Sequence, residues 1–168
     1  RYEVSGTEMP DFIPYIEKML DIEIEDNDKL REVDEKFVSP SKVDKKFYQE
    51  LEKVFENDKL TIENTERLIH SHGQETFKDI YKVLYKSIDR LVDLVFYPES
   101  EEDVKKIIEI ALKFNVCLIP YGGGTNVTRA LSVPENEKRT VVSIDTRRLS
   151  KIEWINKEDR RVLSLIHI

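Results

Sequence analysis

Three consecutive glycines, Gly122 to Gly124, constrain the fold of this chain more than any other feature of its sequence. They follow a short apolar run that ends at Ile119-Pro120, and the polar residues Thr125 and Asn126 come directly after them. The chain has only five glycines in 168 residues, so three in one place indicate a turn or a close approach of the backbone to a ligand. Successive backbone N–H groups in such a turn can converge on an anion, typically a phosphate.

The glycine run by itself fits two interpretations. It is either a tight loop between two strands, which glycine-rich segments commonly form, or a cradle for the phosphates of a nucleotide. Its spacing matches neither the dinucleotide fingerprint G-x-G-x-x-G nor the Walker sequence G-x-x-x-x-G-K-[ST]. The choice between the two interpretations therefore depends on the flanking segments.

The upstream flank predicts a strand, a helix and a second strand. Residues 91–97 read as a buried strand, and Ser100 with Asp103 has the spacing of a capping box at the start of a helix that ends at Phe114. Residues 116–119 form the second strand, which leads into the glycines. The predicted apolar face of the helix consists of Val104, Ile107, Ile108, Ala111 and Leu112.

Such a unit should cross over in the right-handed sense. It places the glycine turn at the carboxyl end of a strand, where open α/β sheets bind ligands. Downstream, residues 139–144 and 149–155 read as strands, 156–159 as a turn and 161–168 as a further strand. We therefore predict an α+β fold from about residue 90, with Trp154 in its core.

The first 89 residues are predicted to be a helical and linker region. Helices are expected over residues 10–20 and from Pro40-Ser41 onward, followed by a short extended segment at 60–62. Residues 21–36 are acidic and are interpreted as an exposed linker. Four basic residues at helical spacing should form a solvated face, or alternatively one directed toward a membrane or a substrate phosphate: Lys78, Lys82, Lys86 and Arg90.

Composition excludes several classes of function. The formal net charge is 27 − 34 = −7, which argues against a dedicated nucleic-acid binder. No apolar run is long enough for a transmembrane helix. The single cysteine, Cys117, excludes an internal disulfide and is expected in the core. His70 and His72 lack a third ligand at suitable spacing, so we expect no metal site but a turn whose histidines bond to the backbone.

Three collinear stretches carry a resemblance to a known family: RYEVSGTEMPDF at 1–12, ERLIHSHG at 66–73, and IPYGGGTNV at 119–127 followed by SIDT at 143–146. Together they resemble the vanillyl-alcohol oxidase type flavoproteins and, within these, the alkyldihydroxyacetonephosphate synthase family. The chain departs from the family at His70, where relatives more often have arginine, and at Asn126, where they often have serine. Residues 163–168 do not continue the family pattern.

The resemblance implies that residues 90–168 are a partial FAD-binding domain of the PCMH type, truncated at its carboxyl end, so that the chain is an amino-terminal fragment. It implies FAD as cofactor, with its pyrophosphate held by the turn, mainly through backbone N–H groups. The implied cofactor-binding residues are Pro120, Tyr121, Gly122, Gly123, Gly124, Thr125 and Asn126. Tyr121 is also a candidate for stacking on the cofactor. For His70 and His72 the resemblance implies, as the alternative to backbone bonding, a contact with the substrate or the flavin domain.

The implied reaction is a transferase step of ether-lipid synthesis. Acyl-dihydroxyacetone phosphate exchanges its acyl group for a fatty alcohol and releases a fatty acid, without net redox change of FAD. The resemblance places the catalytic residues beyond residue 168, so we expect none here and no activity from this stretch alone. It further implies a homodimer in the peroxisome with peripheral membrane contact. The alternatives are an FAD-dependent 2-hydroxy-acid oxidase or dehydrogenase of the same fold, and a protein that retains the fold without FAD.

Overall fold

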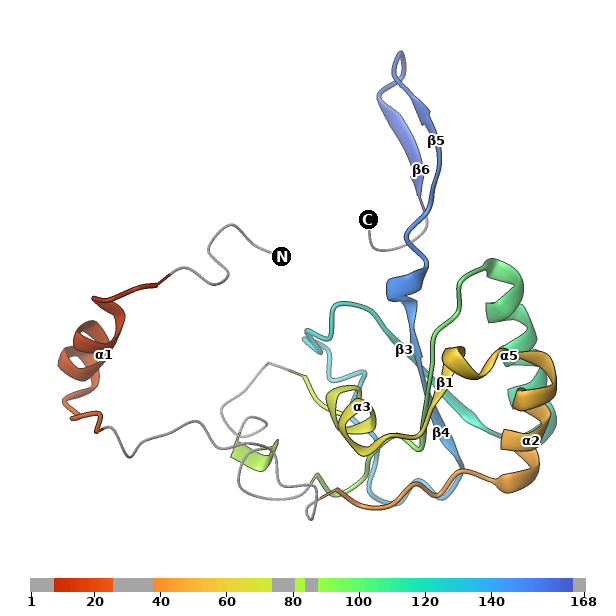
Figure 1. Ribbon diagram of the computed structural model, residues 1–168, viewed down its shortest axis with the longest axis horizontal. Coiled ribbons are helices and arrows are strands. Elements are labelled where there is room, and N and C mark those ends of the chain that lie inside the picture. Colours follow the sequence, from red (N-terminus) through yellow and green to blue (C-terminus); the bar gives the residue numbers. More distant parts are fainter. Residues whose placement is uncertain (1–7, 26–37, 74–80, 84–87, 165–168) are drawn as a thin grey trace. The chain divides into compact units, whose positions relative to one another are not determined.

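The computed structural model describes residues 8–25, 38–73, 81–83 and 88–164 (Figure 1). The chain divides into two compact units, residues 1–32 and residues 33–168. Within the first unit, helix α1 spans Phe12–Leu20 and ends at Asp21 in the left-handed conformation. Its start lies two residues after the predicted one, and none of its side chains is buried within the unit.

The second unit is built on a four-stranded sheet with the order β1-β2-β4-β3 (Figure 1). The strands are β1 (Leu60–Thr61), β2 (Leu94–Phe96), β3 (Cys117–Tyr121) and β4 (Val141–Asp145). β1 is antiparallel to β2, whereas β2, β4 and β3 are mutually parallel. The predicted strand–helix–strand unit is present, but β4 is inserted between its two strands.

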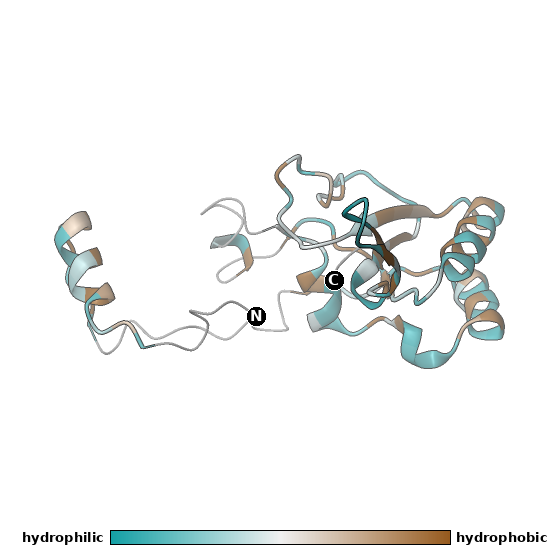
Figure 2. Cartoon of the chain, turned by 90° about the horizontal axis from the view of Figure 1, so that it is seen from above, coloured by the Kyte–Doolittle hydropathy of each residue, from teal (hydrophilic) through white to brown (hydrophobic). Residues whose placement is uncertain are grey.

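Helices α2 (Lys45–Val54) and α5 (Glu101–Phe114) cover one face of this sheet. Figure 2 shows the hydrophobic colouring concentrated along the strands and the hydrophilic colouring on the outer turns of the helices. The core between these layers comprises Phe47, Leu51, Phe55, Leu60, Leu94, Phe96, Ile107, Val142 and Ile144. The opposite face carries a second cluster, which consists of Val92, Val95, Tyr97, Ile119, Leu131 and Val141.

Helix α5 begins and ends as predicted, but its buried face differs. Ser100 Oγ accepts a hydrogen bond from Asp103 N at 3.1 Å, and Asn115 ends the helix at φ 54°. Ile107 and Ala111 are buried, whereas Ile108 and Leu112 are 43% and 77% exposed, so the prediction was wrong for these two. The inward face continues from Ile107 through Ile110 to Phe114, since residues three, four and seven positions apart share one side of a helix.

Helix α2 starts at Lys45, not at the predicted Pro40-Ser41, because the preceding residues are held in an extended segment. Ser41 Oγ donates to Asp93 O at 2.8 Å, and Lys42 N donates to Asp93 Oδ1 at 2.9 Å. Asp44 then caps the helix, with its Oδ1 accepting from Phe47 N at 2.8 Å. A distant aspartate therefore outweighs the local signal of Pro40-Ser41.

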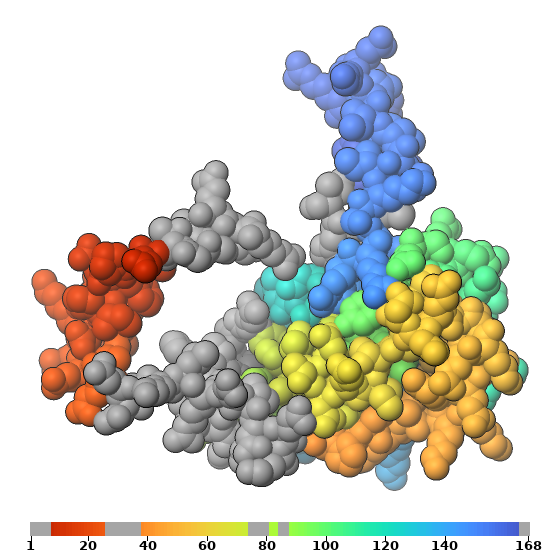
Figure 3. Space-filling model, viewed as in Figure 1, coloured from red at the N-terminus to blue at the C-terminus, as the bar shows by residue number. Residues whose placement is uncertain are grey.

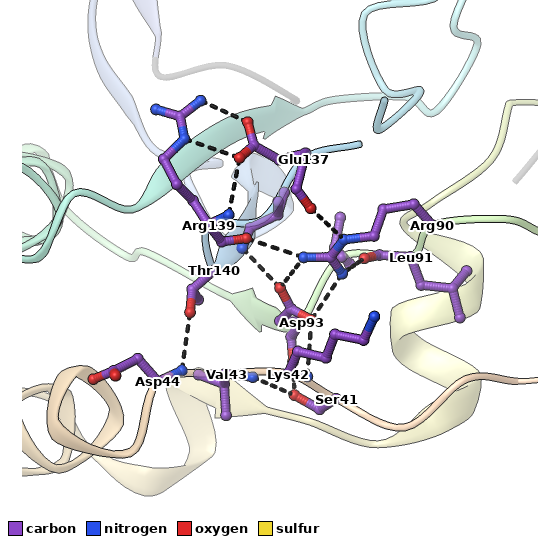
Figure 4. A network of polar contacts seen from close by, with 12 residues as sticks. Ser41, Lys42, Val43, Asp44, Arg90, Leu91, Asp93, Glu137, Arg139 and Thr140 are labelled. Carbon is purple, nitrogen blue, oxygen red and sulfur yellow. Dashed lines mark hydrogen bonds and ion pairs between the residues drawn. The ribbon is translucent and has the colours of Figure 1, made fainter. Parts of the chain in front are cut away.

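Arg90 is buried rather than solvated as predicted (Figure 4). Its guanidinium donates to both carboxylate oxygens of Asp93, at 2.8 and 2.6 Å, and also to the carbonyl oxygens of Leu91, Glu137 and Arg139. Asp93 is fully buried and also accepts from Val141 N at 2.9 Å. Of the other predicted basic residues, Lys82 pairs with Asp89, and Lys78 and Lys86 lie outside the described residues.

The last two strands, β5 (Ile152–Asn156) and β6 (Arg161–Ser164), form an antiparallel hairpin that stands clear of the four-stranded sheet (Figure 1). Trp154 is 47% exposed on this hairpin, so its predicted core position was wrong. A two-stranded hairpin has too few neighbours to bury both faces of its side chains. Residues 165–168 of the predicted last strand lie outside the described residues.

Cys117 is half-buried instead of fully buried, since β3 is the edge strand of the sheet. The predicted acidic linker falls largely on residues 26–37, which lie outside the described ranges, and Asp21 to Glu23 before them are exposed.

Candidate cofactor-binding site

The glycine turn leaves the carboxyl edge of the parallel strands, as the sequence predicts. The strand register pairs Tyr121, the last residue of β3, with Asp145, the last residue of β4. The Thr146 hydroxyl donates to the Tyr121 carbonyl at 3.1 Å and ties the two strand ends together. The glycine turn and the 3₁₀ turn Thr146–Arg148 therefore start side by side.

Gly124 is the glycine whose conformation requires the absence of a side chain. Its φ is 72°, in the left-handed region, and a Cβ at this position would overlap the Tyr121 hydroxyl. At Gly123 a Cβ would make only an ordinary contact, 4.0 Å from Thr125 Cγ2. Gly122, Gly123 and Thr125 are exposed, whereas Gly124 and Asn126 are buried.

Asn126 fixes the far end of the turn. Its φ is 55°, and its side-chain Oδ1 accepts from Leu131 N at 2.8 Å, while its carbonyl accepts from Arg129 N at 2.8 Å. These bonds fold the chain back, so that Leu131 reaches the core of the second face. Asparagine suits this position because it tolerates the left-handed conformation better than most residues.

The turn presents the donors that a phosphate requires. Within the described part of the chain, the backbone N–H groups of Gly123, Gly124 and Thr125 have no backbone hydrogen bond. The turn lines an open concavity of about 290 Å³ together with Val127, Thr128, Ala130 and Leu131. Free N–H groups beside a backbone without side chains suit close contact with a pyrophosphate, so these residues fit FAD.

A buried polar cluster supports the strand ends beneath the turn. His70 Nε2 lies 2.7 Å from Asp145 Oδ2, and His70 Nδ1 lies 2.7 Å from the Glu66 carbonyl oxygen. Both ring nitrogens therefore lie within hydrogen-bond distance of an oxygen atom. The Arg147 guanidinium also contacts Asp145 Oδ2, at 2.7 Å through Nε.

The environment of Asp145 keeps its carboxylate ionised. Its complete burial by itself would raise the pKa, but the hydrogen bonds from His70 and Arg147 outweigh this effect, and the pKa lies below its ordinary value. The cluster therefore consists of a buried carboxylate and two side chains that contact it through nitrogen atoms, His70 and Arg147.

Tyr97 occupies the neighbouring strand end. Its hydroxyl donates to Glu66 Oε2 at 2.5 Å, and burial together with this glutamate raises its pKa. The guanidinium groups of Arg147 and Arg148 lie over its ring, at 5.6 and 5.2 Å from the ring centroid. Arg148 also pairs with Asp58 and Glu99, so these cations are engaged in the fold.

The seven residues predicted to bind the cofactor are consecutive: Pro120 and Tyr121 end β3, and Gly122 to Asn126 form the turn. The interpretation of the histidines as backbone-bonded is confirmed, since His72 Nδ1 also lies 3.0 Å from the Gly73 carbonyl oxygen. Sequence reasoning missed the pair of His70 with Asp145, 75 positions apart. The sequence offered one signal for this pair, namely that Asp145 is a charged residue at the end of an apolar strand.

Among the described residues, no three side chains of the ligand types His, Cys, Asp and Glu gather closely enough to hold a metal ion. In the same ranges, no helix has the length and apolar character that crossing a bilayer requires.

Comparison with known proteins shows what this chain is similar to. Residues 92–164 match the FAD binding domain family. Over 95% of its length the chain is 38% identical to an alkyldihydroxyacetonephosphate synthase of Caenorhabditis elegans. The chain is similar to the alkyldihydroxyacetonephosphate synthases over nearly its whole length, and it contains part of an FAD binding domain. FAD is accordingly its cofactor, and the fold confirms the predicted α+β class with part of an FAD-binding domain.

The structural comparison agrees. A solved structure of an alkyldihydroxyacetonephosphate synthase superimposes with a TM-score of 0.70 at 31% identity, over 78% of this chain and 24% of that one. A mitochondrial D-lactate dehydrogenase (cytochrome) of Arabidopsis thaliana is also similar, at 29% identity over 72% of this chain and 19% of its own. The chain spans about a quarter (26%) of the length of the Caenorhabditis synthase.

Proposed function

We propose that the protein containing this chain is an alkyldihydroxyacetonephosphate synthase. It exchanges the acyl group of acyl-dihydroxyacetone phosphate for a fatty alcohol, forms an ether and releases a fatty acid. The observation that carries the proposal is the 38% identity to a synthase over 95% of this chain, which includes the glycine turn. The open turn at the carboxyl edge of the sheet, with its free N–H groups, supports it.

In this proposal the chain binds the pyrophosphate of FAD. The N–H groups of Gly123, Gly124 and Thr125 donate to the phosphate oxygens, and the exposed Thr125 hydroxyl adds a further donor. Pro120 and Tyr121 end β3 and direct the backbone into the turn, Gly122 leaves room for the ligand, and Asn126 closes the turn. FAD supplies the reactive ring when it is bound, and the protein orients it.

The remaining parts of the proposal concern the whole protein. The catalytic acid and base groups lie outside residues 1–168, so this stretch has no activity by itself. The protein is a homodimer in the peroxisome, with peripheral contact to the membrane that holds its lipid substrates. Each of these statements rests on the similarity of the chain to the synthases.

The test uses the protein expressed from its whole coding sequence. The visible spectrum of the purified protein reports bound flavin, and incubation with acyl-dihydroxyacetone phosphate and labelled fatty alcohol reports the exchange. We expect a yellow protein that incorporates the label into an ether lipid and releases fatty acid. A yellow protein that forms no labelled ether under these conditions contradicts the proposal.

An FAD-dependent 2-hydroxy-acid dehydrogenase is the second candidate, favoured by the similarity to a D-lactate dehydrogenase at 29% identity. It predicts that D-lactate or a related hydroxy acid bleaches the flavin in the absence of oxygen. The synthase predicts no bleaching, because its exchange reaction transfers no electrons to the flavin in the net balance. The same preparation therefore separates the two candidates.

A further inference from the structure

The carboxyl end of helix α3 (Asn64–Ile69) lies directly beneath the glycine turn, although it precedes the FAD binding domain match by some twenty residues. Four residues, His70 to Gly73, leave this helix and run along the second face of the sheet. The first and last of them contact the turn, and both contacts are buried. In Figure 3 the yellow atoms of this part of the chain form part of the packed body.

His70 supports the start of the turn. Its ring is fully buried, with its centroid 4.3 Å from that of Tyr121, and its Nε2 lies 2.7 Å from Asp145 Oδ2. Because Tyr121 and Asp145 are paired in the strand register, one side chain contacts the last residues of both β3 and β4. The Tyr121 hydroxyl in turn occupies the space that a side chain at Gly124 would need. His70 thus reaches the centre of the turn through a single intermediate residue.

Gly73 supports the end of the turn. A Cβ on Gly73 would overlap the Cβ of Asn126, and its amide nitrogen would lie 2.9 Å away. Asn126 is the residue whose Oδ1 accepts from Leu131 N and whose left-handed conformation closes the turn. A methyl group at residue 73 would therefore force Asn126 or the backbone of residue 73 to shift.

We propose that His70 to Gly73 form a positioning element for the FAD-binding turn. They hold Tyr121 at its start and Asn126 at its end before the cofactor arrives, so that the N–H groups of Gly123 to Thr125 need little ordering on binding. This inference rests on the proposed role of the turn in binding the pyrophosphate. It assigns a function in cofactor binding to a segment outside the family's FAD-binding domain.

The first test is a double-mutant cycle between Gly73 and Asn126 in the protein expressed from its whole coding sequence. Gly73→Ala, Asn126→Gly and the double variant are stripped of flavin and titrated with FAD by flavin fluorescence. We expect Gly73→Ala to weaken FAD binding by roughly tenfold or more in the native background. In the Asn126→Gly background, where the opposing Cβ is absent, the same change should weaken FAD binding less than about threefold. An equal loss of FAD affinity in the two backgrounds would overturn the proposal.

The second test separates positioning from folding. His70→Ala is compared with Ile69→Ala, which truncates an exposed side chain on the same helix. Both apoproteins are titrated with FAD and melted without it. We expect Ile69→Ala to bind like the native protein and His70→Ala to bind roughly tenfold more weakly at a temperature where both are folded. Native affinity in folded His70→Ala contradicts the proposal, and if that variant does not fold, the Gly73 cycle decides.

Failure of the proposed function can be told apart from failure of the positioning role. A native protein that binds no FAD contradicts the cofactor assignment itself. Native FAD binding with no loss in either Gly73→Ala or His70→Ala leaves the proposed function standing and removes only the positioning role.

Discussion

At the scale of single residues, conformation and hydrogen bonding distinguish positions that look alike in sequence. Gly123 and Gly124 are neighbours of the same type, yet of the two only Gly124 has a positive φ and would place a Cβ against the Tyr121 hydroxyl. Ser71 and Ser143 are both buried serines, yet the hydroxyl of Ser143 has no partner within the described residues, whereas that of Ser71 has two. Both differences lead to measurable predictions.

Gly124→Ala should destabilise the apoprotein by about 1–2 kcal/mol from its left-handed conformation alone, with a further cost from the overlap with Tyr121. Gly123→Ala is the matched control and should leave the stability nearly unchanged, because its Cβ meets only an ordinary contact. Urea unfolding of the two flavin-free variants measures the difference. Equal stability of the two would contradict the assigned conformations.

Ser143→Ala should leave the stability unchanged or raise it by up to about 1 kcal/mol, because a buried hydroxyl without a partner costs free energy in the folded state. Ser71→Ala should lower it by about 1–3 kcal/mol, because the Ser71 hydroxyl accepts from Val92 N at 2.9 Å and donates to the Arg67 carbonyl. Thermal or urea unfolding of both variants checks the contrast, and a loss at Ser143 as large as that at Ser71 would refute it.

At the scale of elements, one buried aspartate joins three segments of the second unit. Asp93 bonds the chain before α2 through Lys42 N, the start of β4 through Val141 N, and the Arg90 guanidinium (Figure 4). These bonds lie at the amino ends of β2 and β4, opposite the glycine turn. The network therefore joins the strands at their amino ends and takes no part in the carboxyl edge, where we propose that FAD binds.

Asp93→Ala should destabilise the protein by about 3–5 kcal/mol, because it leaves the buried Arg90 guanidinium without its anion. Arg139→Ala provides the control, since its ion pair with Glu137 involves a side chain that is 45% exposed and should contribute little to the stability. Chemical denaturation measures both variants. If Asp93→Ala lowered the free energy of unfolding no more than Arg139→Ala does, the buried Arg90–Asp93 pair would not be a major contributor to stability.

At the scale of the whole molecule, paired carboxylates set the acid stability. Asp145 has a pKa below its ordinary 3.8, and Arg139 lowers the pKa of Glu137 from 4.5 to about 2. Groups with a lowered folded-state pKa stabilise the protein fully above their unfolded value, and this contribution is lost as the pH falls through the folded value. We therefore expect stability to decline from about pH 4.5 downward.

Asp145→Asn should make this acid decline shallower, because one carboxylate no longer takes up a proton on unfolding. At neutral pH the variant should be less stable than the native protein, since His70 and Arg147 lose their anionic partner. Denaturant unfolding at a series of pH values between neutral and about pH 2 measures both effects. An unchanged slope in the variant would exclude Asp145 as a contributor.

The local elements and the position of the glycine turn were predictable from the sequence alone. Hydrophobic patterns placed β2, β3, β4 and α5 to within three residues, and Ser100 and Asn115 marked the ends of α5, because these signals act over a few neighbouring residues. The division of the chain at residue 89 stays a prediction. Tertiary packing placed β4 between β2 and β3, buried Arg90 and left Trp154 exposed, and none of the three could be predicted from the sequence. Tertiary packing also brought His70 to Asp145 and Gly73 to Asn126. Such contacts depend on how distant segments pack, and no periodic pattern in the sequence indicates them.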